Sequence, residues 1–328
     1  MLTPDYLEHA ADTVVALYAS LEDFIVRDIA RRLMKAGAVT HGAAAQILRA
    51  QESGALYDDI IKRVSALMGE SEANLRALFL DAGLQSTDAD NRIYTAAGLS
   101  PAPLTLSFSA MRTLQAGLSK TGGLLFNLTK TTANAAQEAY IRAATMAEMQ
   151  IESGAFDYAR AIRNAVRGLV DEAAYVQYPT GHRSRIDVAV RRAVLTGVNQ
   201  TTAEISLQSA REMGCALVEV SAHVGARASH ALWQGRVFCL SGTRDGYENF
   251  YSATGYGTGA GLCGWNCRHD FYPYFEGLSE SAYPKSRLEE YKNKTAVWNG
   301  REMPYYDATQ RQRAMERRIR DTRRSLAG

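Results

Sequence analysis

The stretch His223–Gly277 carries most of the information about the fold of this chain. It opens with HVGARASHALWQG at His223–Gly235 and closes with TGYGTGAGLCGWNCRHDFYPYFEG at Thr254–Gly277. It holds ten of the chain's 26 glycines and eleven of its 29 aromatic residues. Glycine mixed with aromatic residues is typical of short strands and tight loops, because glycine tolerates positive φ and aromatic residues favour strands. We therefore predict a small α+β, loop-rich module at residues 214–284.

The residues before this module predict helices. Apolar residues between Leu7 and Leu33 recur at steps of three and four, which places them on one face of a helix. Lys130–Ser153 is rich in alanine, a composition typical of a strong helix. Arg185–Met213 predicts a further helix, and Gly197 inside it slightly weakens that prediction. We expect glycines to separate the helices at Gly69, Gly83, Gly98 and Gly122-Gly123.

The pattern changes after Gly214. Cys215–Ala222 reads CALVEVSA, which predicts an alternating β-strand rich in β-branched residues. After Pro284 the chain becomes charged and helical again. The predicted fold class is α+β, mainly α: a long helical scaffold, the glycine- and aromatic-rich module, and a basic C-terminal helix. The predicted regions are 1–100 and 101–213 (both helical), 214–284 (the module) and 285–328 (the tail).

Composition limits the class of protein. Apolar residues make up 46% of the chain and charged residues 22%, as in soluble globular proteins. No unbroken apolar run approaches the ~20 residues that span a bilayer, and no signal peptide is expected at the start. We therefore predict no membrane partner. Without export, the four cysteines are better interpreted as thiols or metal ligands than as a disulfide framework.

The module places cysteine and histidine residues at short spacing. Cys263-x3-Cys267-x-His269 brings three donors into seven residues, and zinc favours such nitrogen and sulfur sets. The alternative is that Cys263 and Cys239 are small apolar core residues and His269 is a hydrogen-bonded loop histidine. The candidate ligands of a structural zinc are His230, Cys263, Cys267 and His269, with His223 as another source of the fourth.

A catalytic interpretation of the same residues is weaker. Cys267, His269 and Asp270 include the residue types of a thiol enzyme. We expect the side chains of Cys267 and His269, as near neighbours on a strand, to point to opposite faces, which argues against a Cys–His pair. Arg268 would lower the pKa of a nearby thiol, but it more simply binds a carboxylate. GYGTGAG lacks the context of a phosphate-binding loop. We predict no catalytic residue, and we expect Trp233 to bury against the aromatic run Phe271–Phe275.

The order of these motifs resembles the phage minor capsid protein 2 family, which is related to the broader phage head-morphogenesis proteins. The upstream segments Phe156–Val166 and Arg185–Ile205 also fit, so the resemblance covers about residues 154–324. It is diffuse over the first hundred residues. The residues that carry the motif are His223, His230, Trp233, Gly235, Trp265, Asn266, Cys267, Arg268 and His269.

The resemblance implies a structural minor capsid protein of a tailed phage, present in few copies, with no established enzymatic activity or metal. It would dock at the portal or inner capsid during procapsid assembly, with the portal protein or major capsid protein as partner. We expect it in the virion, and in the host cytoplasm during assembly. One alternative is a metal-dependent hydrolase or nuclease that uses His230, Cys267 and His269. Another is a DNA-binding accessory factor that acts through the tail.

The tail carries a local excess of charge. Residues 311–324 contain seven arginines against Glu316 and Asp321, an excess of +5, so the rest of the chain sums to −3. These arginines could contact phosphates of packaged DNA or a protein partner. They could equally belong to a solvated helix whose side chains pair locally. Four of them share one helix face by their spacing: Arg313, Arg317, Arg320 and Arg324.

Overall fold

The computed structural model describes residues 1–36, 43–153, 157–170, 175–178, 181–244 and 246–327. The chain divides into two compact units, each drawn from three separate segments. We call them the sheet unit and the bundle unit. The sheet unit comprises Met1–Asp12, Asn74–Gly122 and Arg192–Ala314, and the bundle unit comprises Thr13–Ala73, Gly123–Arg191 and Met315–Gly328.

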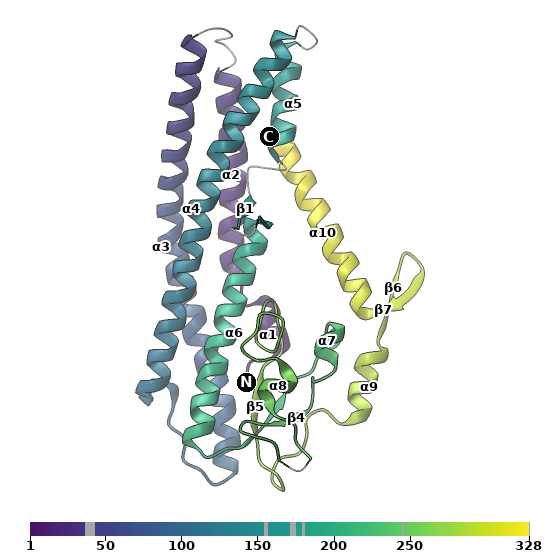
Figure 1. Ribbon diagram of the computed structural model, residues 1–328. Coiled ribbons are helices and arrows are strands. Elements are labelled where there is room, and N and C mark those ends of the chain that lie inside the picture. Colours follow the sequence, from purple (N-terminus) through teal and green to yellow (C-terminus); the bar gives the residue numbers. More distant parts are fainter. Residues whose placement is uncertain (37–42, 154–156, 171–174, 179–180, 245, 328) are drawn as a thin grey trace. The chain divides into compact units, whose positions relative to one another are not determined.

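The bundle unit is built from long helices. α2 (Asp12–Ala36) lies beside the first part of α3 (Ala43–Ala96) and the last part of α4 (Phe108–Glu152), and α5 (Tyr158–Val170) follows α4 (Figure 1). The residues of the apolar face predicted between Leu7 and Leu33 are almost fully buried. The single helix is wrong, because the chain turns at residues 10–11, so Leu7 lies before that turn and the face from Val14 onward lies in α2. These buried residues include Val14, Tyr18, Leu21, Ile25, Ile29 and Leu33.

Ion pairs tie the helices of the bundle unit together. Arg32 on α2 is 5% exposed, and it donates to Asp28 on its own helix and to Glu52 and Asp59 on α3. A buried guanidinium is tolerated only when its donors are satisfied, and these carboxylates satisfy it. The interaction therefore holds α2 at a defined height against α3.

Three of the four predicted helix breaks are wrong. α3 runs without interruption through Gly69 and Gly83, and α4 runs through Gly122-Gly123. A helical glycine costs only about 1 kcal/mol relative to alanine, and tertiary packing of a long amphipathic helix outweighs that cost. The chain does break near Gly98, which has φ of +80° just after the end of α3. A short 3₁₀ turn, η1 (Leu104–Leu106), precedes α4.

The sheet unit contains a three-stranded antiparallel sheet in the order β4-β3-β5. The central strand is β3 (Leu217–Val220), flanked by β4 (Val237–Cys239) and β5 (Phe271–Tyr274). The predicted strand is therefore confirmed, but its alternation is wrong, since all four residues of β3 are buried. Glu219 tolerates burial because its carboxylate accepts hydrogen bonds from Tyr272, Ser281 and Ala282.

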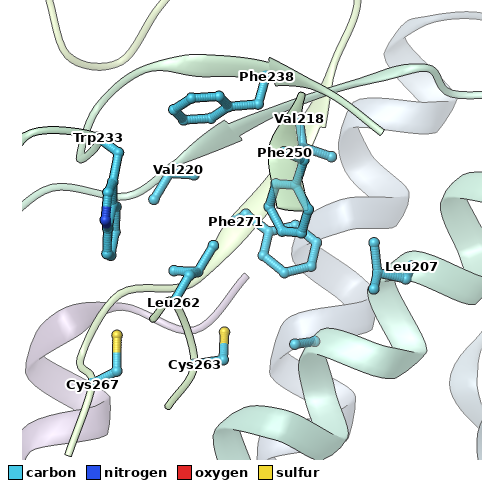
Figure 2. Packing of buried hydrophobic residues seen from close by; sticks show 11 residues of the cluster. Leu207, Val218, Val220, Trp233, Phe238, Phe250, Leu262, Cys263, Cys267 and Phe271 are labelled. Atoms are coloured by element: carbon cyan, nitrogen blue, oxygen red, sulfur yellow. The ribbon is translucent and has the colours of Figure 1, made fainter. Parts of the chain in front are cut away.

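One apolar cluster lies under this sheet. Phe250 and Phe271 meet edge to face with ring centroids 4.9 Å apart, and Trp233 closes one side (Figure 2). Figure 2 also shows the sulfur atoms of Cys263 and Cys267 directed into the cluster. The cluster consists of Ala203, Leu207, Val218, Val220, Trp233, Phe238, Phe250, Leu262, Cys263, Cys267 and Phe271.

Two further long helices are α6 (Ile186–Glu212) and α10 (Tyr305–Ala327). α6 confirms the helix predicted at Arg185–Met213. The mainly helical α+β class is also confirmed. Within the described residues, no helix combines the length and apolar composition needed to cross a membrane. The short elements are α1 (Pro4–His9), β1 (Tyr175–Gln177), β2 (Arg183–Arg185), α7 (Ala228–Ala231), α8 (Phe250–Thr254), α9 (Lys285–Asn293), β6 (Thr295–Trp298) and β7 (Arg301–Pro304).

Candidate metal centre

The loop before β5 is folded tightly on itself. A Cβ atom on Gly261 would lie 2.0 Å from the carbonyl oxygen of Gly255, and one on Gly264 would lie 2.5 Å from that of Gly259. Only glycine fits at such contacts, which explains the glycine-rich sequence. Two non-glycine residues here, Cys263 and Asn266, have φ of +57° and +53°. This left-handed turn directs the next residue, Cys267, into the interior.

Three side chains converge beside that turn. His230 lies in α7, and Cys267 and His269 lie just before β5. The two Nδ1 atoms are 3.3 Å apart, and Cys267 Sγ is 3.7 Å from His230 Nδ1 and 3.6 Å from His269 Nδ1. We call these three side chains the triad. All three are buried, with 1–2% of their surface exposed.

The second nitrogen of each imidazole has a defined partner. His230 Nε2 lies 2.9 Å from the Ala260 carbonyl oxygen, and His269 Nε2 lies 3.1 Å from Gln234 Oε1. Gln234 Oε1 also accepts from the backbone N–H of His223 at 3.1 Å, which identifies this atom as the amide oxygen. Both acceptors are oxygens, so each imidazole carries its proton on Nε2 and presents an Nδ1 lone pair to the triad.

Burial keeps the triad uncharged. It lowers the pKa of His230 to about 4 and the pKa of His269 well below its ordinary value. It raises the pKa of the Cys267 thiol to about 11. At neutral pH the imidazoles are therefore neutral and the thiol is protonated. A thiolate–imidazolium pair, which a cysteine nucleophile needs, does not form in this environment.

The expectation that Cys267 and His269 would not meet is wrong. Residues two apart in an extended segment project to the same side, so their side chains can approach. Cys263 lies apart from the triad: its thiol faces the His269 carbonyl oxygen at 3.7 Å, and in the described residues the metal-binding group consists of the triad alone. His223 stacks on His269 with ring centroids 4.4 Å apart, and burial lowers its pKa to about 4.

The other motif residues support this arrangement. Trp233 packs on His230 and His269 with ring centroids 4.4 and 4.9 Å apart. Gly235 has φ of +65°, and Arg268 forms an ion pair with Glu8. Trp265 is 60% exposed, unlike Trp233.

The prediction for Trp233 holds in part. Its cluster includes Phe271, at the start of the aromatic run predicted to cover it. Tyr272 instead donates its hydroxyl to Glu219, and Phe275 packs on Tyr94 with ring centroids 6.1 Å apart.

Two residues that form hydrogen bonds around the triad were not predicted from the sequence. Asn199 on α6 donates from Nδ2 to the carbonyl oxygens of Cys267 and His269, both at 3.1 Å. Gln234 sets the tautomer of His269. Gln234 stands between Trp233 and Gly235 in the quoted motif, so its position could have identified it. Asn199 is one polar residue in a long helix, and nothing in the sequence distinguishes it.

The structure describes three of the four arginines predicted to share one face of the tail, and they have different surroundings. Arg313 and Arg317 are exposed on α10. Arg320 Nε lies 3.4 Å from Asp187 Oδ2, and the neighbouring Asp321 pairs with Arg185 at 2.6 Å, both inside the bundle unit. The side chain of Arg324 lies outside the described part of the structure.

Comparison with known proteins gives the family. The model of the family described as phage minor capsid protein 2 matches residues 2–328. The chain belongs to this family. The resemblance drawn from the motifs is therefore confirmed, and the chain is a structural component of a phage particle.

Two curated relatives carry matching segments. A protein named "Structural protein" of Lactococcus phage LL-H is 30% identical over 145 residues, which is 43% of this chain and 36% of that protein. Another of the same name, from Lactococcus phage mv4, is 39% identical over 66 residues, or 20% of this chain and 45% of that protein. The match thus spans less than half of either relative. No solved structure matches.

Proposed function

We propose that this minor capsid protein is a non-catalytic assembly component that docks at the portal or the inner capsid while the procapsid forms. The observation that carries the proposal is the family match, which extends over residues 2–328. The relatives named as structural proteins support the same class of function.

The chemistry of the buried cluster supports a non-catalytic role. Substrate turnover needs reactive groups at a surface that the substrate can reach. His230, Cys267 and His269 are buried, and burial holds the thiol in its protonated, weakly nucleophilic form. The hydrolase or nuclease alternative is therefore the less favoured function.

Exposed apolar side chains offer contacts for a partner. Leu106 on η1 and Phe108 at the start of α4 are 77% and 78% exposed. Further large apolar residues on α4 are exposed as well, and such residues are a common feature of protein-binding surfaces. These further residues are Leu124, Phe126, Ile141, Met146 and Met149.

Omission of the protein from infected cells tests the proposed function. Particles assembled without it are expected to fail in DNA packaging or infection, and normal, infectious particles would contradict the assembly role. The double variant Leu106→Asp, Phe108→Asp is expected to lose co-purification with procapsids while the chain stays folded. Gln115→Asp, also exposed on α4, is the matched control and should still co-purify.

A second candidate function is contact with DNA through α10. Five arginines of this helix are exposed along its described length, which favours attraction to phosphates. Arg320 lies near Asp187 and Asp321 pairs with Arg185, so the other arginines of α10 would contact the DNA. These exposed arginines are Arg311, Arg313, Arg317, Arg318 and Arg323.

If α10 binds DNA, affinity should fall steeply with salt, with a slope of about 0.9 in the logarithmic plot per neutralised phosphate. The double variant Arg317→Gln, Arg318→Gln should then reduce the slope by roughly two. Arg163→Gln, Arg167→Gln on α5 removes the same charge elsewhere and should leave the slope unchanged. Binding isotherms at several salt concentrations measure this, and equal slopes for both double variants would reject α10 as the contact.

A further inference from the structure

We propose that His230 Nδ1, Cys267 Sγ and His269 Nδ1 hold a structural zinc ion that locks the module around β3. The proposal concerns folding of this module and does not depend on which partner the protein docks on.

The hydrogen bonds around the triad leave too few hydrogen-bond donors for the lone pairs at its centre. Both imidazoles are committed to donate from Nε2, to Ala260 and Gln234. Their Nδ1 lone pairs face each other at 3.3 Å with no donor on either atom. The single proton of the Cys267 thiol can serve one lone pair and leaves the other unpaired in a buried site. A divalent cation satisfies both nitrogens and the sulfur together.

The spacing of the three atoms matches zinc. Bonds of about 2.0–2.1 Å to nitrogen and about 2.3 Å to sulfur, at tetrahedral angles, put two nitrogens about 3.3 Å apart and nitrogen and sulfur about 3.6 Å apart. The observed separations are 3.3 Å between the nitrogens and 3.6 and 3.7 Å to the sulfur. A thiolate with two imidazoles suits zinc better than calcium or magnesium, which prefer oxygen ligands.

The surroundings are those of a preorganised ligand set. Metal-binding histidines usually donate their other N–H to a carbonyl or carboxylate, as both imidazoles do here. Asn199 on α6 donates hydrogen bonds to the carbonyl oxygens of Cys267 and His269 and so fixes the segment that carries these two ligands. The charge of Arg268, next in sequence to both ligands, is neutralised by Glu8. Three of the four ligands of a tetrahedral zinc ion are therefore in place without any movement of the chain.

The metal would be structural. The triad residues are 1–2% exposed, so a substrate has no route to the ion. The three donors come from α7 and from the segment before β5, which are far apart in sequence. An ion that bonds both would close the loops between residues 230 and 267 and stabilise the sheet unit.

Elemental analysis of the full chain, produced without a histidine tag, tests the proposal. We expect about one zinc per chain, at least about tenfold less in Cys267→Ala and His230→Ala, and full content in Cys239→Ala. Cys239 is a matched control, because it is equally buried and its thiol instead faces the Ser241 carbonyl oxygen at 3.1 Å. Metal retained in both triad variants would overturn the assignment.

The wild-type chain gives a test that needs no variant. After removal of metal with a chelator, added cobalt should produce a sulfur-to-cobalt charge-transfer band with the intense visible bands of tetrahedral cobalt. Added zinc should displace cobalt and raise the melting temperature. A wild-type chain that shows neither the thiolate–cobalt band nor a zinc-dependent rise in melting temperature overturns the proposal, even if the triad variants fail to fold.

Discussion

Gly117→Ala and Gly197→Ala should each destabilise the sheet unit by about 3 kcal/mol, although alanine is the better helix former. The two glycines lie where α4 and α6 cross. A Cβ on Gly117 would lie 2.0 Å from Thr201 Oγ1, and one on Gly197 would lie 2.1 Å from Thr121 Oγ1. Rotation of the threonines gives no relief, because their Cβ atoms are only 2.9 and 3.2 Å away. The helices must separate, and a close-packed interior resists this.

Gly122→Ala is the matched control on α4. Its Cβ would meet nothing within 4 Å, so this variant should gain about 0.5–1 kcal/mol from helix propensity. Urea denaturation of the three variants measures the difference. Thr201→Ala added to Gly117→Ala should restore part of the loss, since it removes the contacts at 2.0 and 2.8 Å. If all three glycine variants raise the midpoint alike, the close approach of α4 and α6 is refuted.

Glu22→Gln should stabilise the bundle unit at pH 9 by about 5 kcal/mol and leave it nearly unchanged at pH 4. Glu22 is 2% exposed on α2. Burial raises its pKa from 4.5 to about 8, and repulsion by Asp187 adds to this. Arg185 and Arg320 act in the opposite direction, and Asp23 adds a smaller repulsion.

The sign of the pH dependence follows from proton uptake. Between pH 4.5 and about 8 the folded chain keeps the Glu22 proton while the unfolded chain releases it. Stability from this group is therefore present at low pH and is lost as the pH rises through that window. Urea midpoints of wild type, Glu22→Gln and the control Asp58→Asn, an exposed acidic residue on α3, taken from pH 4 to 9, check the prediction. Parallel curves for wild type and Glu22→Gln would show that the buried carboxyl does not titrate as described.

The helical part of the fold could be predicted wherever the signal was local. The three- and four-residue period marked α2, and Arg185–Met213 differs from α6 by a residue at each end. The glycine breaks could not be judged locally. Gly83 and Gly122 remain helical because of packing, and Gly197 is required by Thr121 on another helix. The four consecutive regions drawn from the sequence stay a prediction.

Some local signals were present but passed over. Asn299-Gly300 joins β6 to β7, with φ of +49° and +73°, and this dipeptide is a strong predictor of a hairpin. The two strands were not predicted, because the charged residues around this dipeptide favoured a helical interpretation. The short β1–β2 hairpin was also missed.

The candidate site could be predicted only as a set of residue types. The spacing pointed to Cys263, Cys267 and His269, with His230 or His223 as the fourth ligand. In the described residues His230, Cys267 and His269 meet, and Cys263 is not part of the group. Which nitrogen faces the centre depends on Ala260 and Gln234, whose positions only the folded loop defines. Cys263 lies in the same loop with a left-handed backbone, and its thiol faces the His269 carbonyl oxygen instead of the two Nδ1 atoms.

The central claim is that this minor capsid protein is an assembly component of the phage head. An asymmetric reconstruction of procapsids that carry the protein with a bulky density label tests it most directly. We expect the label in few copies at the portal vertex or on the inner shell beside it. A label absent from purified procapsids, or found only in the unassembled soluble fraction, would contradict the account.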